Sequence, residues 1–147
     1  MKKLVVFSCF ALLLLTGFFV FGNLDEKPET TVRKLEFIDR IDEIVSIEIS
    51  KMPSPPTTHI TESQELILEI AEYVNQYEGR KIKLEPYGGW EVSLTVYYQD
   101  HTDSGCSFSS GRISDFSGEY FLVGDDFREQ LLAFYEQMEP VQDGGNK

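Results

Sequence analysis

The sequence contains little cysteine and histidine, and this scarcity excludes several kinds of site. Its 147 residues include two cysteines and two histidines. Cys9 lies in an N-terminal apolar run, so Cys106 is alone in the rest of the chain and no disulfide can form there. Neither the cysteine spacing of a zinc site nor a glycine-rich phosphate loop is present. We expect no cofactor, and the fold must rest on its hydrophobic core.

Basic residues are few compared with acidic ones. The chain has 13 Lys and Arg against 25 Asp and Glu. Lys2 and Lys3 are the only charges before Asp25, so removing the first 22 residues leaves 11 basic and 25 acidic residues, a net charge of −14. Such a surface repels phosphate backbones and anionic lipid headgroups. We therefore expect no nucleic-acid partner, and membrane contact only through the N-terminal segment.

The N-terminus has the pattern of an export segment. Two lysines precede an uncharged run of 19 residues from Leu4 to Gly22. A basic start and an apolar run are typical of a secretory signal peptide, although this run approaches the roughly 20 residues of a membrane-spanning helix. A cleaved signal peptide and a membrane anchor formed by residues 4–22 both stay open. Either one places the remainder outside the cytoplasm, as a secreted or an anchored protein.

The strongest strand pattern lies between Trp90 and Tyr98. Apolar and polar residues alternate there with a period of two, which predicts a strand with one buried and one solvent-facing side. The apolar positions are Trp90, Val92, Leu94, Val96 and Tyr98. We expect this strand to be central in an antiparallel sheet.

Other strands are predicted around it. Ile44–Ser50 alternates in the same way, and the proline-rich segment after it stops the strand. A turn-rich loop after Tyr98 predicts a hairpin with Cys106–Ile113, where Gly111 suggests a bulge. Tyr120–Val123 is a short final strand, and Arg80–Leu84 alternates basic and apolar residues as a short edge strand does.

Two helices are predicted from apolar stripes. In the first, Thr61 and Gln64 form a capping box and Gly79 is placed to end the helix. The second begins at Asp125 or Asp126, and Pro140 ends it. Their apolar stripes are Leu66, Ile67, Ile70, Ala71, Val74 and Tyr77 in the first helix, and Phe127, Leu131, Phe134, Tyr135 and Met138 in the second.

These elements predict an α+β fold. It has an antiparallel sheet of about four strands with two helices packed on one face, in the order β-α-β-β-β-α. We expect a leader at residues 1–22, a linker or irregular arm at 23–43, one domain at 44–139 and a disordered tail at 140–147. Within the arm, residues 32–43 fit near-helical spacing and an extended segment about equally well.

Chemistry-bearing residues are sparse, and we predict no catalytic group. Asp100 and Asp103 in the hairpin loop supply oxygens that suit a weak calcium site, although solvated turn residues explain them more simply. Cys106 is predicted to face inward, away from His101, as an inert buried cysteine does. Carboxylates are numerous enough that a pair placed for acid–base catalysis stays open.

The solvent-facing side of the sheet is the more interesting surface. Ser93, Thr95 and Tyr97 on the central strand are expected beside Ser107 and Ser109 on its neighbour, which makes a flat face bearing hydroxyls and an aromatic ring. Trp90 is placed to add an aromatic rim or to cap the core. Such a face suits a peptide, a glycan or a partner domain, although it is also the ordinary wet side of an antiparallel sheet.

The overall pattern resembles small exported proteins of Gram-positive bacteria. The similarity consists of the Lys2-Lys3 leader, an α+β domain entered through Ile44–Ser50, and a Gly89-Trp90-Glu91 strand start followed by a turn-rich hairpin. This resemblance implies no activity and no functional residue.

Our leading hypothesis is an extracytoplasmic, non-catalytic interaction or sensing module whose partner is an envelope protein, a peptide or a glycan. The alternatives are a small cell-envelope hydrolase that uses carboxylates and a weak calcium-dependent binder.

Overall fold

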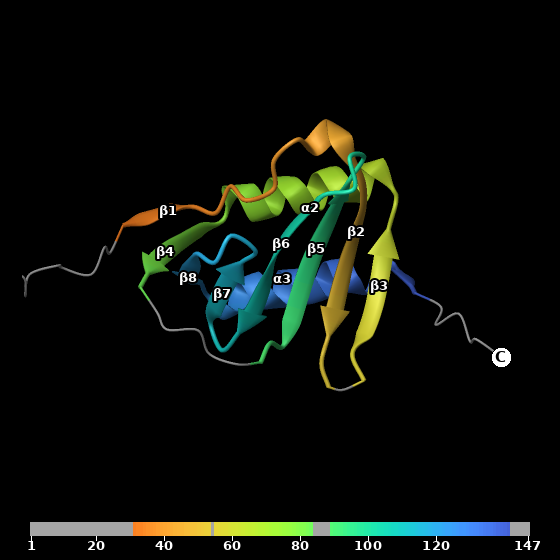
Figure 1. Cartoon of the computed structure of the whole chain (residues 1–147). Coiled ribbons are helices and arrows are strands. Elements are labelled where there is room, and N and C mark those ends of the chain that lie inside the picture. The colour runs from red at the N-terminus through yellow and green to blue at the C-terminus, as the bar shows by residue number, and fades with distance from the viewer. Residues whose placement is uncertain (1–30, 54, 84–88, 142–147) are drawn as a thin grey trace, which may run out of the picture.

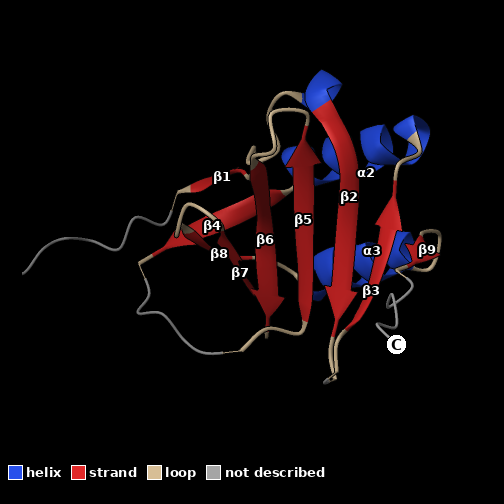
Figure 2. Ribbon diagram, turned by 45° about the vertical axis from the view of Figure 1, so that its right-hand side comes forward, coloured by secondary structure: helices blue, strands red, loops and turns tan. Residues whose placement is uncertain are grey.

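Alternating apolar and polar residues build a sheet that is buried on one side only. The computed structural model describes residues 31–53, 55–83 and 89–141, in which nine strands form one antiparallel sheet. Both long helices pack on the same face of this sheet (Figure 1). The opposite face has no helix over it in the described part of the chain (Figure 2).

The strands follow the sheet order β1-β4-β8-β7-β6-β5-β2-β3-β9. Their bounds are β1 Val32–Lys34, β2 Ile44–Lys51, β3 Thr57–Thr61, β4 Glu78–Ile82, β5 Val92–Tyr98, β6 Asp103–Ser109, β7 Arg112–Asp115, β8 Tyr120–Leu122 and β9 Glu139–Pro140. The helices are α2 Gln64–Gln76 and α3 Asp125–Tyr135, and the short 3-10 helix η1 spans Ile41–Glu43.

Strand β5 is central, as its alternation predicts. It lies between β2 and β6, and it buries Val92, Leu94, Val96 and Tyr98. The buried sides of α2 and α3 complete the core from the other layer. Their buried residues are Ile67, Ile70, Ala71 and Val74 in α2, and Phe127, Leu131, Phe134 and Tyr135 in α3.

The prediction of about four strands is wrong, although the α+β class is roughly right. The sheet has nine strands among the described residues, and two of the additional strands, β3 and β7, arise because segments of the chain turn back on themselves. After the proline-rich segment the chain returns as β3, which pairs with β2 along its whole length. Ser110 and Gly111, both with positive φ, form a two-residue turn that starts β7, where we had expected a bulge inside one strand.

Two further strands, β1 and β9, are too short to leave a clear sequence pattern. Strand β1 pairs three residues with β4, and β9 pairs two residues with β3. Strand β4 is not an edge, since β1 covers one side of it and β8 the other. Residues 32–43 form β1 and η1, and within them Leu35 and Ile38 are buried in the core.

The boundaries of the first helix also differ from the prediction. Thr61 is the last residue of β3, and the N-cap position belongs to Ser63. The Thr61 Oγ1 atom accepts a hydrogen bond from the Ser63 backbone N–H at 3.2 Å. Gly79 lies inside β4, where a Cβ atom would sit 2.9 Å from Leu35 Cδ2 and 3.1 Å from Phe121 Cβ. The glycine therefore allows close packing and does not cap the helix.

Truncating a core side chain of α2 tests this packing. Ile70 is fully buried, so Ile70→Ala removes apolar contacts and leaves a cavity, and we expect a loss of about 2–5 kcal/mol in the free energy of unfolding. Leu68 on the same helix is 45% exposed, so Leu68→Ala is the matched control and should change stability by less than about 0.5 kcal/mol. Urea unfolding measures both values, and equal effects would contradict the assigned helix orientation.

Candidate functional site

A row of hydroxyl groups crosses the open face of the sheet. We call it the hydroxyl row, and its members are Ser50, Thr58, Ser93, Ser107 and Ser114. These residues lie directly opposite one another on five adjacent strands, β3, β2, β5, β6 and β7. Neighbouring strands are about 4.8 Å apart, so the row presents a hydroxyl at each strand interval. All five side chains are half-buried by their neighbours.

The hydroxyl row is only partly satisfied by internal hydrogen bonds. Ser50 Oγ and Thr58 Oγ1 share a bond of 2.7 Å. Ser93 Oγ donates to the Cys106 carbonyl oxygen at 3.5 Å, which is a weak contact. Of the described residues, none supplies a hydrogen bond to the side chain of Ser107. Part of the row therefore depends on water or on a ligand for its hydrogen bonds.

Tyr97 and Thr95 lie on the same face, beside the hydroxyl row on β5. The Tyr97 hydroxyl donates a hydrogen bond to Glu48 Oε2 at 3.1 Å. Partial burial and the hydrogen bond to this carboxylate raise the pKa of the Tyr97 hydroxyl above its usual value. Tyr97 is 37% exposed. Its ring and hydroxyl are accessible to a ligand.

Gly105 interrupts the side chains of the open face opposite Thr95. Its φ of +153° favours glycine, and a Cβ atom there would lie 2.1 Å from the Leu94 carbonyl oxygen. On the other side of Gly105, the Phe116 N–H donates to the Gly105 carbonyl oxygen at 3.0 Å. The Phe116 side chain is 48% exposed. A buried glycine without a side chain therefore lies between Thr95 and the exposed Phe116.

The structure places the predicted binding residues as follows. Thr95, Tyr97 and Ser107 share the open face, with Ser107 inside the hydroxyl row. Ser109 ends β6 and lies opposite Arg112, further along the same side. Trp90 precedes β5 and is half-buried.

Three members of the hydroxyl row were missed as binding residues. Thr58 and Ser114 belong to β3 and β7, which were not predicted as separate strands, so nothing placed them on this face. Ser50 was predicted at a solvent-facing position of its strand, but its partners were unknown. The β-branched run from Thr57 to Thr61 was the available signal for β3.

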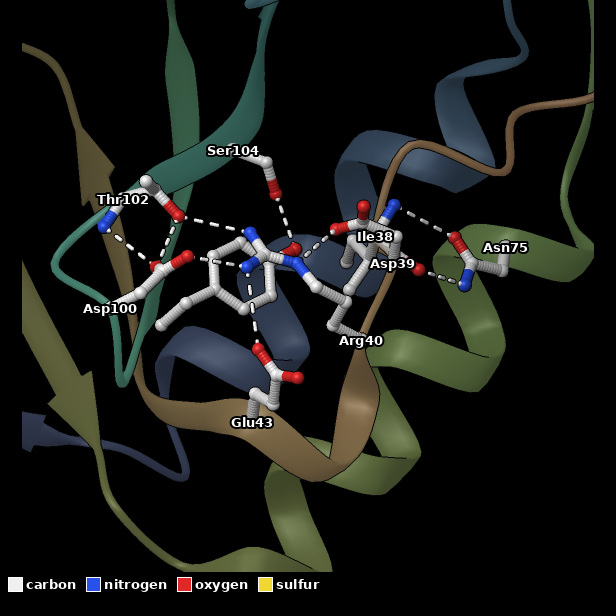
Figure 3. A network of polar contacts seen from close by, with 9 residues as sticks. Ile38, Asp39, Arg40, Glu43, Asn75, Asp100, Thr102 and Ser104 are labelled. Atoms are coloured by element: carbon white, nitrogen blue, oxygen red, sulfur yellow. Dashed lines mark hydrogen bonds and ion pairs between the residues drawn. The ribbon is translucent and has the colours of Figure 1, made fainter.

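The predicted calcium ligand Asp100 is engaged by a cation of the protein itself (Figure 3). Arg40 Nη1 donates to Asp100 Oδ2 at 2.6 Å and to Glu43 Oε2 at 3.3 Å, and its Nη2 donates to Thr102 Oγ1 at 2.9 Å. The guanidinium also lies 4.3 Å from the centre of the Tyr98 ring. These contacts fasten the β5–β6 hairpin loop to η1.

This environment favours the ionised form of Asp100. The hydrogen bond from the Thr102 side chain is the largest cause, and the hydrogen bond from Arg40 is the second. Together they hold the pKa of the Asp100 carboxyl well below its usual range. Asp103 lies apart from this cluster, on β6 opposite Tyr97. The described residues contain no group of three or more His, Cys, Asp or Glu that could hold a metal ion.

Of the cysteine and the two histidines among the described residues, only His101 is exposed. Cys106 is completely buried, and burial raises the pKa of its thiol well above the usual range. His101 is exposed at the hairpin loop, while Cys106 faces the core. The His59 ring stacks on Tyr135 with centroids 3.7 Å apart, and its Nδ1–H donates to the Tyr135 carbonyl oxygen at 2.8 Å.

A groove of about 570 Å³ lies where β3 and the start of α2 meet residues 137–139. Four glutamates border it, Glu62, Glu65, Glu69 and Glu139.

Two carboxyl groups outside this groove have lowered pKa values. Lys81 and Arg33 lower the pKa of Glu119, and Thr102 and Arg40 lower that of Asp100. A general acid requires a raised carboxyl pKa instead.

No family model matches the chain, and neither a curated protein nor a solved structure does. Within the described residues, no helix has the length and apolar composition that crossing a membrane requires. The leader predicted at residues 1–22 lies outside the described residues, as does most of the tail predicted at 140–147.

The Arg40 cluster predicts a specific pH dependence. The pKa of Asp100 is lower in the folded protein than in the unfolded chain, where it is about 4. Its stabilising contribution is therefore complete above about pH 4 and is lost as the pH falls further. We expect Asp100→Asn to be less stable than the wild type at pH 7, with a difference that narrows progressively below about pH 4.

Urea unfolding across this pH range measures the difference. Asp103→Asn in the same hairpin is the matched control, because Asp103 forms no ion pair with a described residue. A wild-type advantage that stays constant down to pH 2.5 would show that Arg40 does not act through the Asp100 charge.

Proposed function

We propose that this protein is a non-catalytic binding module that works outside the cytoplasm, and that the open face of its sheet is the binding surface. The observation that carries this proposal is the hydroxyl row, which continues without interruption across five strands. A ligand lying on it meets a hydroxyl on each strand, together with Thr95, Tyr97 and the exposed ring of Phe116.

The chemistry of the face suits a partner rich in hydrogen-bonding groups. Hydroxyls both donate and accept, so they can bind sugar hydroxyls, peptide groups or polar side chains. Aromatic rings with a polar tip, such as Tyr97, are common at interfaces because they offer both apolar area and a hydrogen bond. The partner is an envelope protein, a peptide or a glycan that lies across the strands.

Addition of a peptide strand at the edge of the sheet fits less well. Strand addition uses the unpaired backbone groups of an exposed edge. The two edge strands, β1 and β9, are three and two residues long. Short edges of this kind discourage pairing with another chain. Recognition by the face of the sheet is therefore the better supported mode.

The extracytoplasmic location in this proposal rests on the lysine-led apolar run of residues 2–22. The non-catalytic character rests on the state of the candidate groups. Cys106 is inaccessible, His59 is held against Tyr135, and Asp100 is ion-paired. No observation on the described residues favours the hydrolase or the calcium binder as a second candidate.

Substitutions on the face test the proposal. Tyr97→Ala removes an exposed side chain that contributes no core packing, so the fold should be retained while partner affinity falls about tenfold, as expected for a central aromatic residue of an interface. Thr95→Ala should weaken binding less. Leu68→Ala, which is exposed on the other side of the molecule, is the control and should bind normally.

The partner is identified by position-specific crosslinking. A photoreactive amino acid replaces Ser107 or Leu68 in the full chain, and intact cells are irradiated. We expect a specific adduct from position 107 and none from position 68, with mass spectrometry defining its chemistry. Tyr97→Ala should reduce this adduct without changing the circular dichroism spectrum. Identical labelling from both positions, or unchanged capture by the Tyr97 and Thr95 variants, would refute the open face as the binding surface.

A further inference from the structure

The positive charges of this acidic protein are concentrated at one end of the sheet. We define the basic end as strands β1, β4, β7 and β8, the turn at residues 116–119, and Lys83. It carries six of the nine Lys and Arg in the described part of the chain and three carboxylates. The rest of the described residues carry three cations and 17 carboxylates. The cations of the basic end are Arg33, Lys34, Arg80, Lys81, Lys83 and Arg112.

The strand register brings these cations together. Arg80 and Arg112 both lie opposite Leu122, one from each neighbouring strand. Arg33 and Lys81 are held by Glu119, to which Lys81 Nζ donates at 2.6 Å. Arg80 and Lys34 are exposed, and they form no ion pair with any described residue. The basic end therefore retains uncompensated positive charge at the surface.

The chain enters the domain at this same end. Strand β1 begins at Val32, and the apolar run ends at Gly22. The nine residues between them span at most about 30 Å when fully extended. In a chain anchored by residues 4–22, the edge strand of the basic end is thus tethered close to the lipid headgroups. Figure 1 shows β1 and β4 together at one end of the sheet, far from β3.

We propose that the basic end docks on the anionic lipid surface of the membrane that holds the leader, and so orients the domain. This inference rests on the proposed location outside the cytoplasm and on an uncleaved anchor. Each Lys or Arg near an anionic surface adds to the attraction, and the effect is limited to about one Debye length. The acidic remainder of the protein is repelled by the same surface. Attraction of the basic end and repulsion of the remainder therefore favour the same orientation. Four of the five members of the hydroxyl row lie on β3, β2, β5 and β6, outside the basic end, so that part of the open face stays available to its partner.

Lysine acylation in lipid nanodiscs tests the docking. The full chain is reconstituted in discs of phosphatidylcholine alone and in discs that also contain phosphatidylglycerol. An amine-reactive ester then labels the lysines, and mass spectrometry gives the rate at each site. We expect Lys34 and Lys83 to react several times more slowly in the anionic discs. Lys51, on β2, should react equally in both, and 1 M salt should abolish the difference.

Two variants of equal charge change separate docking from general electrostatics. Arg80→Gln removes a cation of the basic end, and the protection of Lys34 should fall about fivefold. Arg128→Gln removes a cation from α3, outside the basic end, and should leave that protection unchanged. Equal effects of the two variants would overturn the proposal.

Equal Lys34 rates in both discs, or a chain that stays with neither disc, would also overturn it. The proposed function is judged separately by the adduct at position 107. That adduct together with equal Lys34 rates refutes only the docking, whereas protection of Lys34 without an adduct refutes only the binding face.

Discussion

The structure depends on the one-sided burial of its central strands. Val92, Leu94 and Val96 of β5 are buried beneath the two helices, while the alternate residues Ser93 and Thr95 face solvent. A shift of one residue in the pairing of β5 would exchange these two sets, so burial fixes the register of the whole sheet. The hydroxyl row exists because that register places polar residues of five strands opposite one another. The same constraint that stabilises the core therefore builds the candidate binding surface.

The long, periodic elements were predictable, and the reason is physical. Strand β5 and helices α2 and α3 bury a regular side, so their period is visible in the sequence. Strands β1 and β9 have three and two residues, which is too few for a period to show. Strand β3 was not predicted because the proline-rich segment before it was interpreted as the end of the strand region. In the structure, these prolines belong to the connection between β2 and β3. The candidate site was therefore predicted only in part. A row of residues that crosses several strands cannot be recognised until all of those strands are known.

The net charge of the whole chain does not show how the fold distributes its charged residues. The net charge of −12 predicts repulsion from anionic surfaces, yet β1, β4 and β7 bring most of the described cations to one end. The hairpin loop shows the same effect on a smaller scale. Asp100 is a residue type that often binds metal ions, but its negative charge is paired with Arg40, which lies 60 residues earlier. In both cases the decisive partner is distant in the sequence and close in the structure, so residue content alone gives the wrong electrostatic environment.

The central claim is that the open face is occupied in the cell, and thiol accessibility tests it most directly. Ser93→Cys and Ser107→Cys place reporters in the hydroxyl row, Leu68→Cys serves as the reference, and the native Cys106 is buried. The measurement is the rate of reaction with a thiol reagent in intact cells divided by the rate for purified protein. The account predicts a ratio well below that of position 68 at both serine positions. The same ratio at all three positions would contradict it, because the face would then be an ordinary solvated side of a sheet.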